Sequence, residues 1–115
     1  MSKYTLYHNP RCSKSREALQ LLQSKGINAD VVLYLENPPS VDELKKIIKK
    51  LGISAKDLLR TKETEYKDLE LQHEEKEDVI LNAMHKHPKL IERPILLANG
   101  KAAIGRPPEN ILSIL

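Results

Sequence analysis

The chain has 115 residues, a length typical of one domain, and 40% of them are hydrophobic although Phe and Trp are both absent. Acidic and basic side chains are interspersed and the formal net charge is only +3, which argues against a nucleic-acid-binding surface. The sequence shows no apolar run long enough to span a membrane and no signal-peptide pattern. We therefore expect a cytoplasmic protein that forms a single domain over residues 1–115 and does not bind a membrane.

The first part of the chain is predicted to form a strand, a helix and a second strand. A short apolar run predicts a strand over residues 3–7, and apolar residues at helical spacing predict a helix over residues 13–25 that Gly26 ends. An apolar run with β-branched residues predicts a second strand over residues 30–34. Two strands joined through a helix in this way lie parallel in one sheet, which is typical of an α/β fold.

The middle of the chain is predicted to be helical. Ser40–Glu43 has the pattern of a capping box, in which the Ser and Glu side chains bind each other's backbone N–H groups, and it begins a helix over residues 41–51. We expect a short helix over residues 54–60, a short helix and loop over residues 64–75, and another helix over residues 76–86. The inward side chains of this last helix are expected to be Val79, Ile80, Ala83 and Met84.

The last quarter of the chain is predicted to form a hairpin and a closing helix. Apolar runs at residues 94–98 and 101–104 flank Asn99 and Gly100, a dipeptide that favours a type I′ turn because it tolerates positive φ at both positions. A closing helix is predicted to begin near Pro108. Together the elements predict a thioredoxin-like α/β fold: a mixed four-stranded sheet flanked by helices, with a helical insertion between strands 2 and 3.

Cys12 is the only cysteine, and it falls where the first strand gives way to the first helix. A thiol at a helix start meets the positive end of the helix dipole, and His8, Arg11, Lys14 and Arg16 are close in sequence. Such surroundings lower the pKa of a thiol and produce a nucleophile. The alternative is that Cys12 is a buried and inert small hydrophobic residue, the commoner fate of a free cysteine.

The loop around Cys12 resembles that of a known family. The run His8–Cys12, followed by Ser15 and Arg16, is similar to the active-site loop of the glutaredoxin-coupled arsenate reductases, and the match runs nearly end to end. The other segments that carry the resemblance are Tyr34–Pro39, Leu59-Arg60, Glu92–Ile95 and Gly105–Pro107.

The resemblance implies a thiol-dependent reduction of arsenate to arsenite with glutathione and glutaredoxin as reductants. Glutathione would be a co-substrate and glutaredoxin the protein partner. We also expect a monomer without a bound cofactor, and no metal site, because the histidines lack supporting cysteines and a recognised ligand spacing. In the implied site, Cys12 is the nucleophile, and His8 and Ser15 help to hold its thiolate. The implied oxyanion-binding residues are Arg60, Arg93 and Arg106, and Pro94 is expected to follow a cis peptide bond.

Departures from familiar motifs leave other functions open. The loop reads Arg-Cys-Ser-Lys-Ser over residues 11–15, where the family commonly has Ala-Cys-Gly-Thr-Ser, and this variant resembles a sister subgroup. A Cys-x-x-Cys redox pair is absent because position 15 is Ser, and the phosphatase-type pattern is absent because position 18 is Ala. One alternative is a monothiol glutathione-dependent or glutaredoxin-like oxidoreductase without arsenate activity. The other is a non-enzymatic regulator of the same fold.

Overall fold

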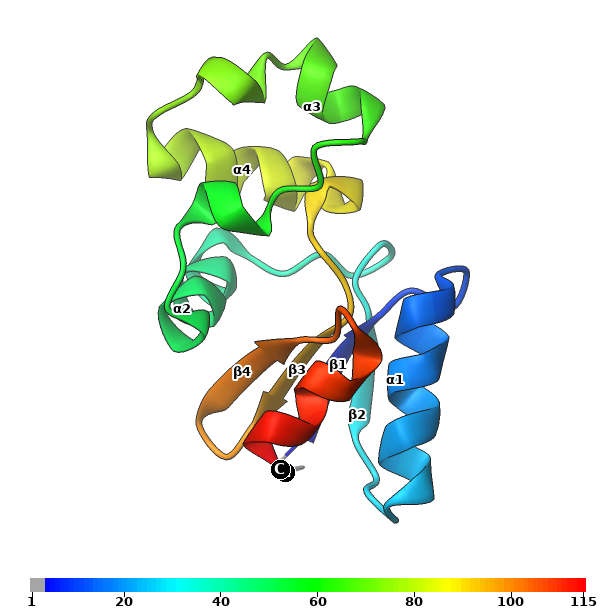
Figure 1. The fold of residues 1–115 in the computed structure, drawn as a ribbon. Coiled ribbons are helices and arrows are strands. Elements are labelled where there is room, and N and C mark those ends of the chain that lie inside the picture. The colour runs from blue at the N-terminus through cyan, green and yellow to red at the C-terminus, as the bar shows by residue number, and fades with distance from the viewer. Residues whose placement is uncertain (1–3) are drawn as a thin grey trace. The chain divides into compact units, whose positions relative to one another are not determined.

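A four-stranded mixed sheet is built from the two ends of the chain (Figure 1). Its strands are β1 (Tyr4–His8), β2 (Asp30–Leu33), β3 (Ile95–Ala98) and β4 (Lys101–Ile104), arranged in the order β2-β1-β3-β4. β1 and β2 are parallel, whereas β3 is antiparallel to both β1 and β4. The predicted mixed, thioredoxin-like sheet is therefore confirmed.

The structure is a computed structural model that describes residues 4–115, in two compact units. The sheet unit contains the described residues up to Asn37 together with Arg93–Leu115, and the helical unit is the insertion Pro38–Glu92. The strand expected over residues 3–7 is β1, and its expected first residue lies outside the described part of the chain.

One face of the sheet is covered by α1 (Ser13–Ser24) and by the closing helix η4 (Pro108–Ile114), which lie side by side in Figure 1. The closing helix is a 3-10 helix. The apolar side chains between the two helices and the sheet remove their surface from water, and this burial is the main force that holds the sheet unit together. The buried residues of this core are Leu6, Ala18, Leu22, Leu96, Ala98 and Ile111.

The turn between β3 and β4 has the geometry that its sequence predicts. Asn99 and Gly100 have φ values of 54° and 77°, so both lie in the left-handed region that a type I′ turn requires. The register pairs Ala98 with Lys101 and Ile95 with Ile104. The hairpin therefore brings the residues before β3 and after β4 to the same end of the sheet.

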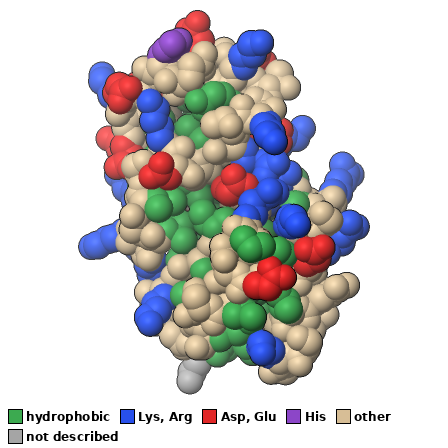
Figure 2. Space-filling view, viewed as in Figure 1, with side chains coloured by type: hydrophobic (Ala, Val, Ile, Leu, Met, Phe, Trp, Pro, Cys, Tyr) green, Lys and Arg blue, Asp and Glu red, His purple; other side chains and the backbone are tan. Residues whose placement is uncertain are grey.

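The helical unit forms from segments with strong local signals. Ser40 and Glu43 form the predicted capping box, in which the Glu43 N–H donates to Ser40 Oγ at 3.1 Å. Within residues 4–115, no helix has the length and apolar character that crossing a membrane requires. Acidic and basic side chains are interspersed over this unit in Figure 2. Its elements are α2 (Val41–Leu51), η1 (Ala55–Leu58), α3 (Thr64–Asp68), η2 (Leu71–His73), α4 (Glu77–Lys86) and η3 (Pro88–Leu90).

The inward face of α4 differs from the prediction. Val79 is 42% exposed, whereas Leu81 is fully buried together with Ile80 and Met84. With 3.6 residues per turn, Val79 points roughly 150° away from the centre of the stripe that these three side chains form. The prediction that Val79 points inward is therefore wrong, because apolar character alone does not decide which face of a helix meets the core.

Candidate active site

Cys12 occupies the N-cap position of α1, directly after the turn that follows β1. Its backbone N–H donates to the Asn9 carbonyl at 3.0 Å, and its own carbonyl accepts the first helical hydrogen bond from the Arg16 N–H at 3.0 Å. The sulfur therefore stands at the amino end of the helix, near backbone N–H groups that have no partner within the helix.

The surroundings of the Cys12 thiol lower its pKa. Partial burial by itself raises the pKa, but hydrogen bonds from the backbone N–H groups of Ser15 and Lys14 and from the Arg93 guanidinium outweigh burial. Each of these donors stabilises the thiolate more than the neutral thiol. Cys12 thus meets the electrostatic requirement for an activated nucleophile.

The positively charged side chain that lowers the pKa of the Cys12 thiol belongs to a segment distant in sequence. The side chains of Arg11, Lys14 and Arg16, which the sequence suggests as the basic environment, are all exposed, and Lys14 acts on the sulfur through its backbone N–H. The guanidinium that lowers the pKa belongs to Arg93. The low thiol pKa predicted from local sequence is present, but the charges responsible are supplied by the fold.

The rate of Cys12 alkylation should report this lowered pKa directly. Because only the thiolate reacts, the rate should rise with pH and reach its midpoint below the ordinary thiol value of about 8.5. Iodoacetamide modification followed by intact mass measures the profile, since Cys12 is the only thiol. Arg93→Ala should move the midpoint upward, and Arg16→Ala, at an exposed position, should leave it in place. A wild-type midpoint at or above the ordinary value would contradict the activated thiol.

Two arginines flank the sulfur from the same end of the sheet. Arg106 Nη2 lies 3.8 Å from Cys12 Sγ, and Arg106 Nε donates to the Arg93 carbonyl at 2.9 Å. The Arg93–Pro94 bond is cis, and the Arg106–Pro107 bond is cis as well. The hairpin places both arginines beside Cys12 because they precede β3 and follow β4.

Gly105 allows the segments that carry the two arginines to approach closely. Its N–H donates to the Pro94 carbonyl at 2.8 Å, and a Cβ at this position would lie 2.8 Å from Pro94 Cγ. No side chain fits at that distance without a shift of the neighbouring segment. Because position 105 is glycine, the segment that carries Arg106 can lie close to the segment that carries Arg93, just before β3.

His8 and Ser15 form a buried network that fixes the loop. Ser15 Oγ lies 2.6 Å from His8 Nδ1 and accepts a hydrogen bond from the Asn9 N–H at 3.0 Å. Burial lowers the pKa of His8, so the imidazole is neutral at pH 7 and the Ser15 hydroxyl can donate to Nδ1. The Ser15 side chain thus holds the loop, while its backbone N–H reaches the Cys12 thiol.

Asn9 and Tyr34 also belong to the site, although sequence reasoning alone does not mark either as a functional residue. Asn9 Oδ1 accepts from the Arg11 N–H at 3.0 Å and so shapes the turn. Tyr34 is only 1% exposed, and burial raises the pKa of its hydroxyl despite the nearby Arg93 and Asn9 side chains. The signals for both residues lie in the strings that carry the family resemblance, since the run His8–Cys12 includes Asn9 and the string Tyr34–Pro39 begins with Tyr34.

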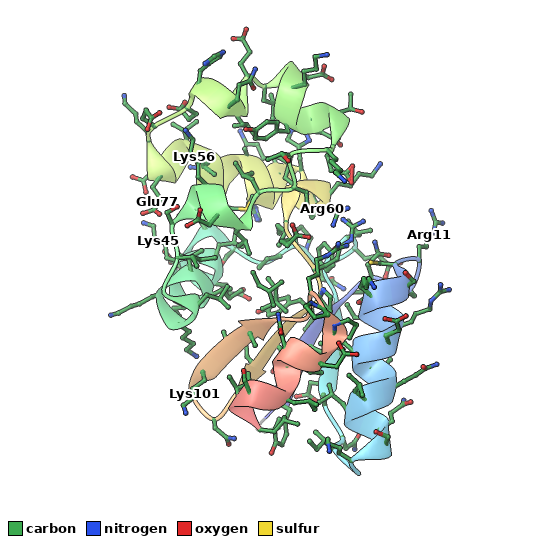
Figure 3. All side chains as sticks on the ribbon, viewed as in Figure 1. Arg11, Lys45, Lys56, Arg60, Glu77 and Lys101 are labelled. Carbon is green, nitrogen blue, oxygen red and sulfur yellow. The ribbon has the colours of Figure 1, made fainter. Side chains whose placement is uncertain are left out.

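Arg60 belongs to the helical unit, where carboxylates surround it. Its Nη1 donates to Glu92 Oε1 at 2.9 Å, and its Nε lies 3.7 Å from Glu63 Oε1 (Figure 3). The Arg60 N–H donates to the Leu90 carbonyl at 2.7 Å, which fixes the backbone. Its side chain is 17% exposed. The role of Arg60 as an oxyanion ligand stays a prediction.

The groups around the Cys12 sulfur are almost all hydrogen-bond donors: two guanidinium groups and two backbone N–H groups. Guanidinium groups bind tetrahedral oxyanions through paired, charge-assisted hydrogen bonds. Across residues 4–115, no three His, Cys, Asp or Glu side chains gather in a group that could hold a metal ion. The arrangement is suited to bind an oxyanion beside a nucleophilic thiolate.

Comparison with known proteins identifies relatives over the whole chain. The model of the ArsC family matches residues 7–114. An arsenate reductase of Neisseria meningitidis is 53% identical over 117 residues, covering 100% of both chains, and one of Haemophilus influenzae is 49% identical over 112 residues, covering 96% of this chain and 97% of its own. The solved structure of an arsenate reductase from Vibrio cholerae superposes with a TM-score of 0.96 at 49% identity, covering 99% of this chain and 98% of that one.

Proposed function

The chain belongs to the ArsC family, and on that premise we propose that it reduces arsenate to arsenite through Cys12, with glutathione and glutaredoxin as the reductants. The observation that carries the proposal is a thiol of lowered pKa held between two arginines, Arg93 and Arg106. The relatives named above as arsenate reductases support the choice of substrate. A cycle that depends on glutathione requires a reducing compartment, so we infer a cytoplasmic location.

In the first step, the Cys12 thiolate attacks arsenic. A sulfur–arsenic bond forms, and the bond from arsenic to one of its hydroxyl groups breaks as this hydroxyl takes up a proton from solvent and leaves as water. Arg93 and Arg106 bind the remaining oxygens and stabilise the negative charge that develops on them. The backbone N–H groups of Ser15 and Lys14 keep the sulfur ionised before the attack.

The reduction itself requires a second thiol. Reducing arsenate to arsenite takes two electrons, and the single cysteine of this chain cannot close an internal disulfide. A glutathione thiolate attacks the Cys12 sulfur, the sulfur–arsenic bond breaks with its electron pair on arsenic, and arsenite leaves. The product is a disulfide between Cys12 and glutathione, which a glutaredoxin thiol reduces by exchange.

A reconstituted assay tests this proposal. Purified protein, arsenate, glutathione and glutaredoxin together should yield arsenite over many turnovers. Omission of the protein, arsenate or glutathione should reduce the yield to background, whereas omission of glutaredoxin should limit the reaction to a single turnover. When glutaredoxin is withheld, intact mass should show one glutathione added to the protein. Sustained turnover with a non-thiol reductant would contradict the mechanism. Reduction of glutathione mixed disulfides without any reduction of arsenate would instead support a monothiol glutaredoxin-like function.

A further inference from the structure

A cavity of about 270 Å³ lies beside the turn that carries Cys12, within the sheet unit. One wall is formed by residues 8–11, and the other by Leu33, Leu35 and Glu36 after β2. Because the Cys12 N–H donates back to Asn9 at 3.0 Å, Cys12 closes the turn that forms the first wall. We call this cavity the turn pocket. It lies at the carboxyl ends of the parallel strands β1 and β2, where ligands bind in open α/β sheets.

The turn pocket carries one positive and one negative side chain, and both are exposed. Arg11 extends from the turn before α1 in Figure 3, and Glu36 lies on the opposite wall. Among the described residues, no ion pair or hydrogen bond engages either charged group. Leu33 and Leu35 supply an apolar surface in the same cavity, and Leu35 is 37% exposed. Two unpaired opposite charges and an apolar surface complement a small zwitterion that has a short apolar part.

The oxyanion-binding arginines lie outside the turn pocket. Neither Arg93 nor Arg106 lines it, so a ligand there would leave both guanidinium groups available to arsenate. A purely anionic ligand would be repelled by Glu36, whereas a ligand with both an ammonium and a carboxylate satisfies both charges. The pocket therefore fits the second reactant of the cycle better than it fits a second oxyanion.

We propose that the turn pocket is the binding site of the thiol co-substrate, a zwitterionic peptide of the size of glutathione. Arg11 binds its glycine carboxylate, Glu36 binds its ammonium group, and the two leucines contact its methylene groups. The terminal groups of a tripeptide lie only roughly 4–8 Å from its central residue, so a peptide in this pocket can present its thiol at the neighbouring Cys12. This inference rests on the proposed use of glutathione, but its test requires no arsenate.

The test is the exchange of Cys12 with glutathione disulfide. The Cys12 thiolate attacks one sulfur, a Cys12–glutathione disulfide forms, and one glutathione thiolate leaves; intact mass follows the rate. The neutral reference is hydroxyethyl disulfide, which has no charges for the pocket to bind. Arg11→Glu should slow exchange with glutathione disulfide by roughly three- to tenfold, as expected when an exposed ion pair is replaced by repulsion, and should leave the reference reaction nearly unchanged.

Chemically modified glutathione disulfides show which charged group of the ligand Arg11 binds and which one Glu36 binds. When the glycine carboxylates are esterified, Arg11→Glu should no longer slow the reaction selectively. Glu36→Gln should slow exchange with unmodified glutathione disulfide and not with the reference, and it should lose this effect when the amino groups are acetylated. The matched control is Arg16→Glu, which makes the same charge change at an exposed position on α1 outside the pocket. Because glutathione disulfide carries a net negative charge and the reference carries none, Arg16→Glu should slow glutathione disulfide only slightly more than the reference, and a selectivity as large as that of Arg11→Glu would overturn the proposal.

Equal slowing of both unmodified disulfides by Arg11→Glu would overturn the proposal, since it would show only a general effect of charge on the thiolate. Selectivity that persists after esterification would also overturn it. If the wild-type protein shows the selective exchange but never reduces arsenate, the turn pocket stands and the proposed arsenate reduction fails.

Discussion

Replacing Cys12 with serine should reduce arsenate turnover to the rate without enzyme. Serine lacks an ionisable thiol near neutral pH, so neither the sulfur–arsenic bond nor the glutathione disulfide can form. The fold should remain intact, because Cys12 is the N-cap of α1 and serine is a preferred N-cap residue whose hydroxyl can accept from the same backbone N–H groups. The melting temperature of the variant should therefore equal or exceed that of the wild type, as thermal denaturation followed by circular dichroism can measure.

A thiol moved by one residue is the matched control for the loss of turnover in Cys12→Ser. Adding Ser13→Cys to the Cys12→Ser protein restores a thiol at the exposed first position of α1, one residue away from the N-cap. If position relative to Arg93 and Arg106 matters, this double variant should be alkylated by iodoacetamide yet stay inactive toward arsenate. Measurable turnover in the single variant Cys12→Ser would exclude Cys12 as the nucleophile.

Arg93→Ala and Arg106→Ala should each lower kcat/KM for arsenate by roughly ten- to a hundredfold, since a charge-assisted hydrogen bond contributes about 1.5–3 kcal/mol. Arg→Lys at either position should restore only part of the loss, because lysine cannot present two parallel donors to an oxyanion. Steady-state kinetics with saturating glutathione and glutaredoxin measures these effects. Arg16→Ala, an exposed arginine on α1, should behave like the wild type.

The pH dependence of kcat/KM should distinguish Arg93→Ala from Arg106→Ala. Arg93 helps to lower the pKa of Cys12, so Arg93→Ala raises that pKa and reduces the thiolate fraction at any pH below it. The deficit of Arg93→Ala should therefore be largest at low pH and shrink above the raised pKa. Wild-type kinetics in both alanine variants would mean that neither guanidinium contacts the substrate.

Local sequence determines much of this fold, because the relevant signals act over a few residues. The capping box at Ser40 and Glu43 and the positive φ values at Asn99 and Gly100 are properties of neighbouring residues, and both are confirmed. The position of Cys12 at the start of α1 follows in the same way from the pattern of its helix. Apolar runs and helical spacing likewise predict the order of strands and helices along the chain.

The electrostatic environment of Cys12 could not be derived from local patterns. The side chains of Arg11, Lys14 and Arg16 are exposed and do not lower the pKa of the thiol, whereas Arg93 and Arg106 reach the sulfur because β3 and β4 return to the end of β1. Resemblance to a family indicated these two arginines, but elementary spacing rules did not. The buried Tyr34 beside Arg93 was recognisable only as part of a family string.

The strands and helices, their order along the chain and a thiol at a helix start all follow from local sequence patterns. The charges that meet this thiol, the buried face of α4 and the pocket beside the turn depend on tertiary packing. The difference arises from the range over which each interaction acts. Capping, turn formation and helical periodicity act between residues a few positions apart. Coulomb attraction and burial depend on distance in space, which strand pairing between remote segments sets.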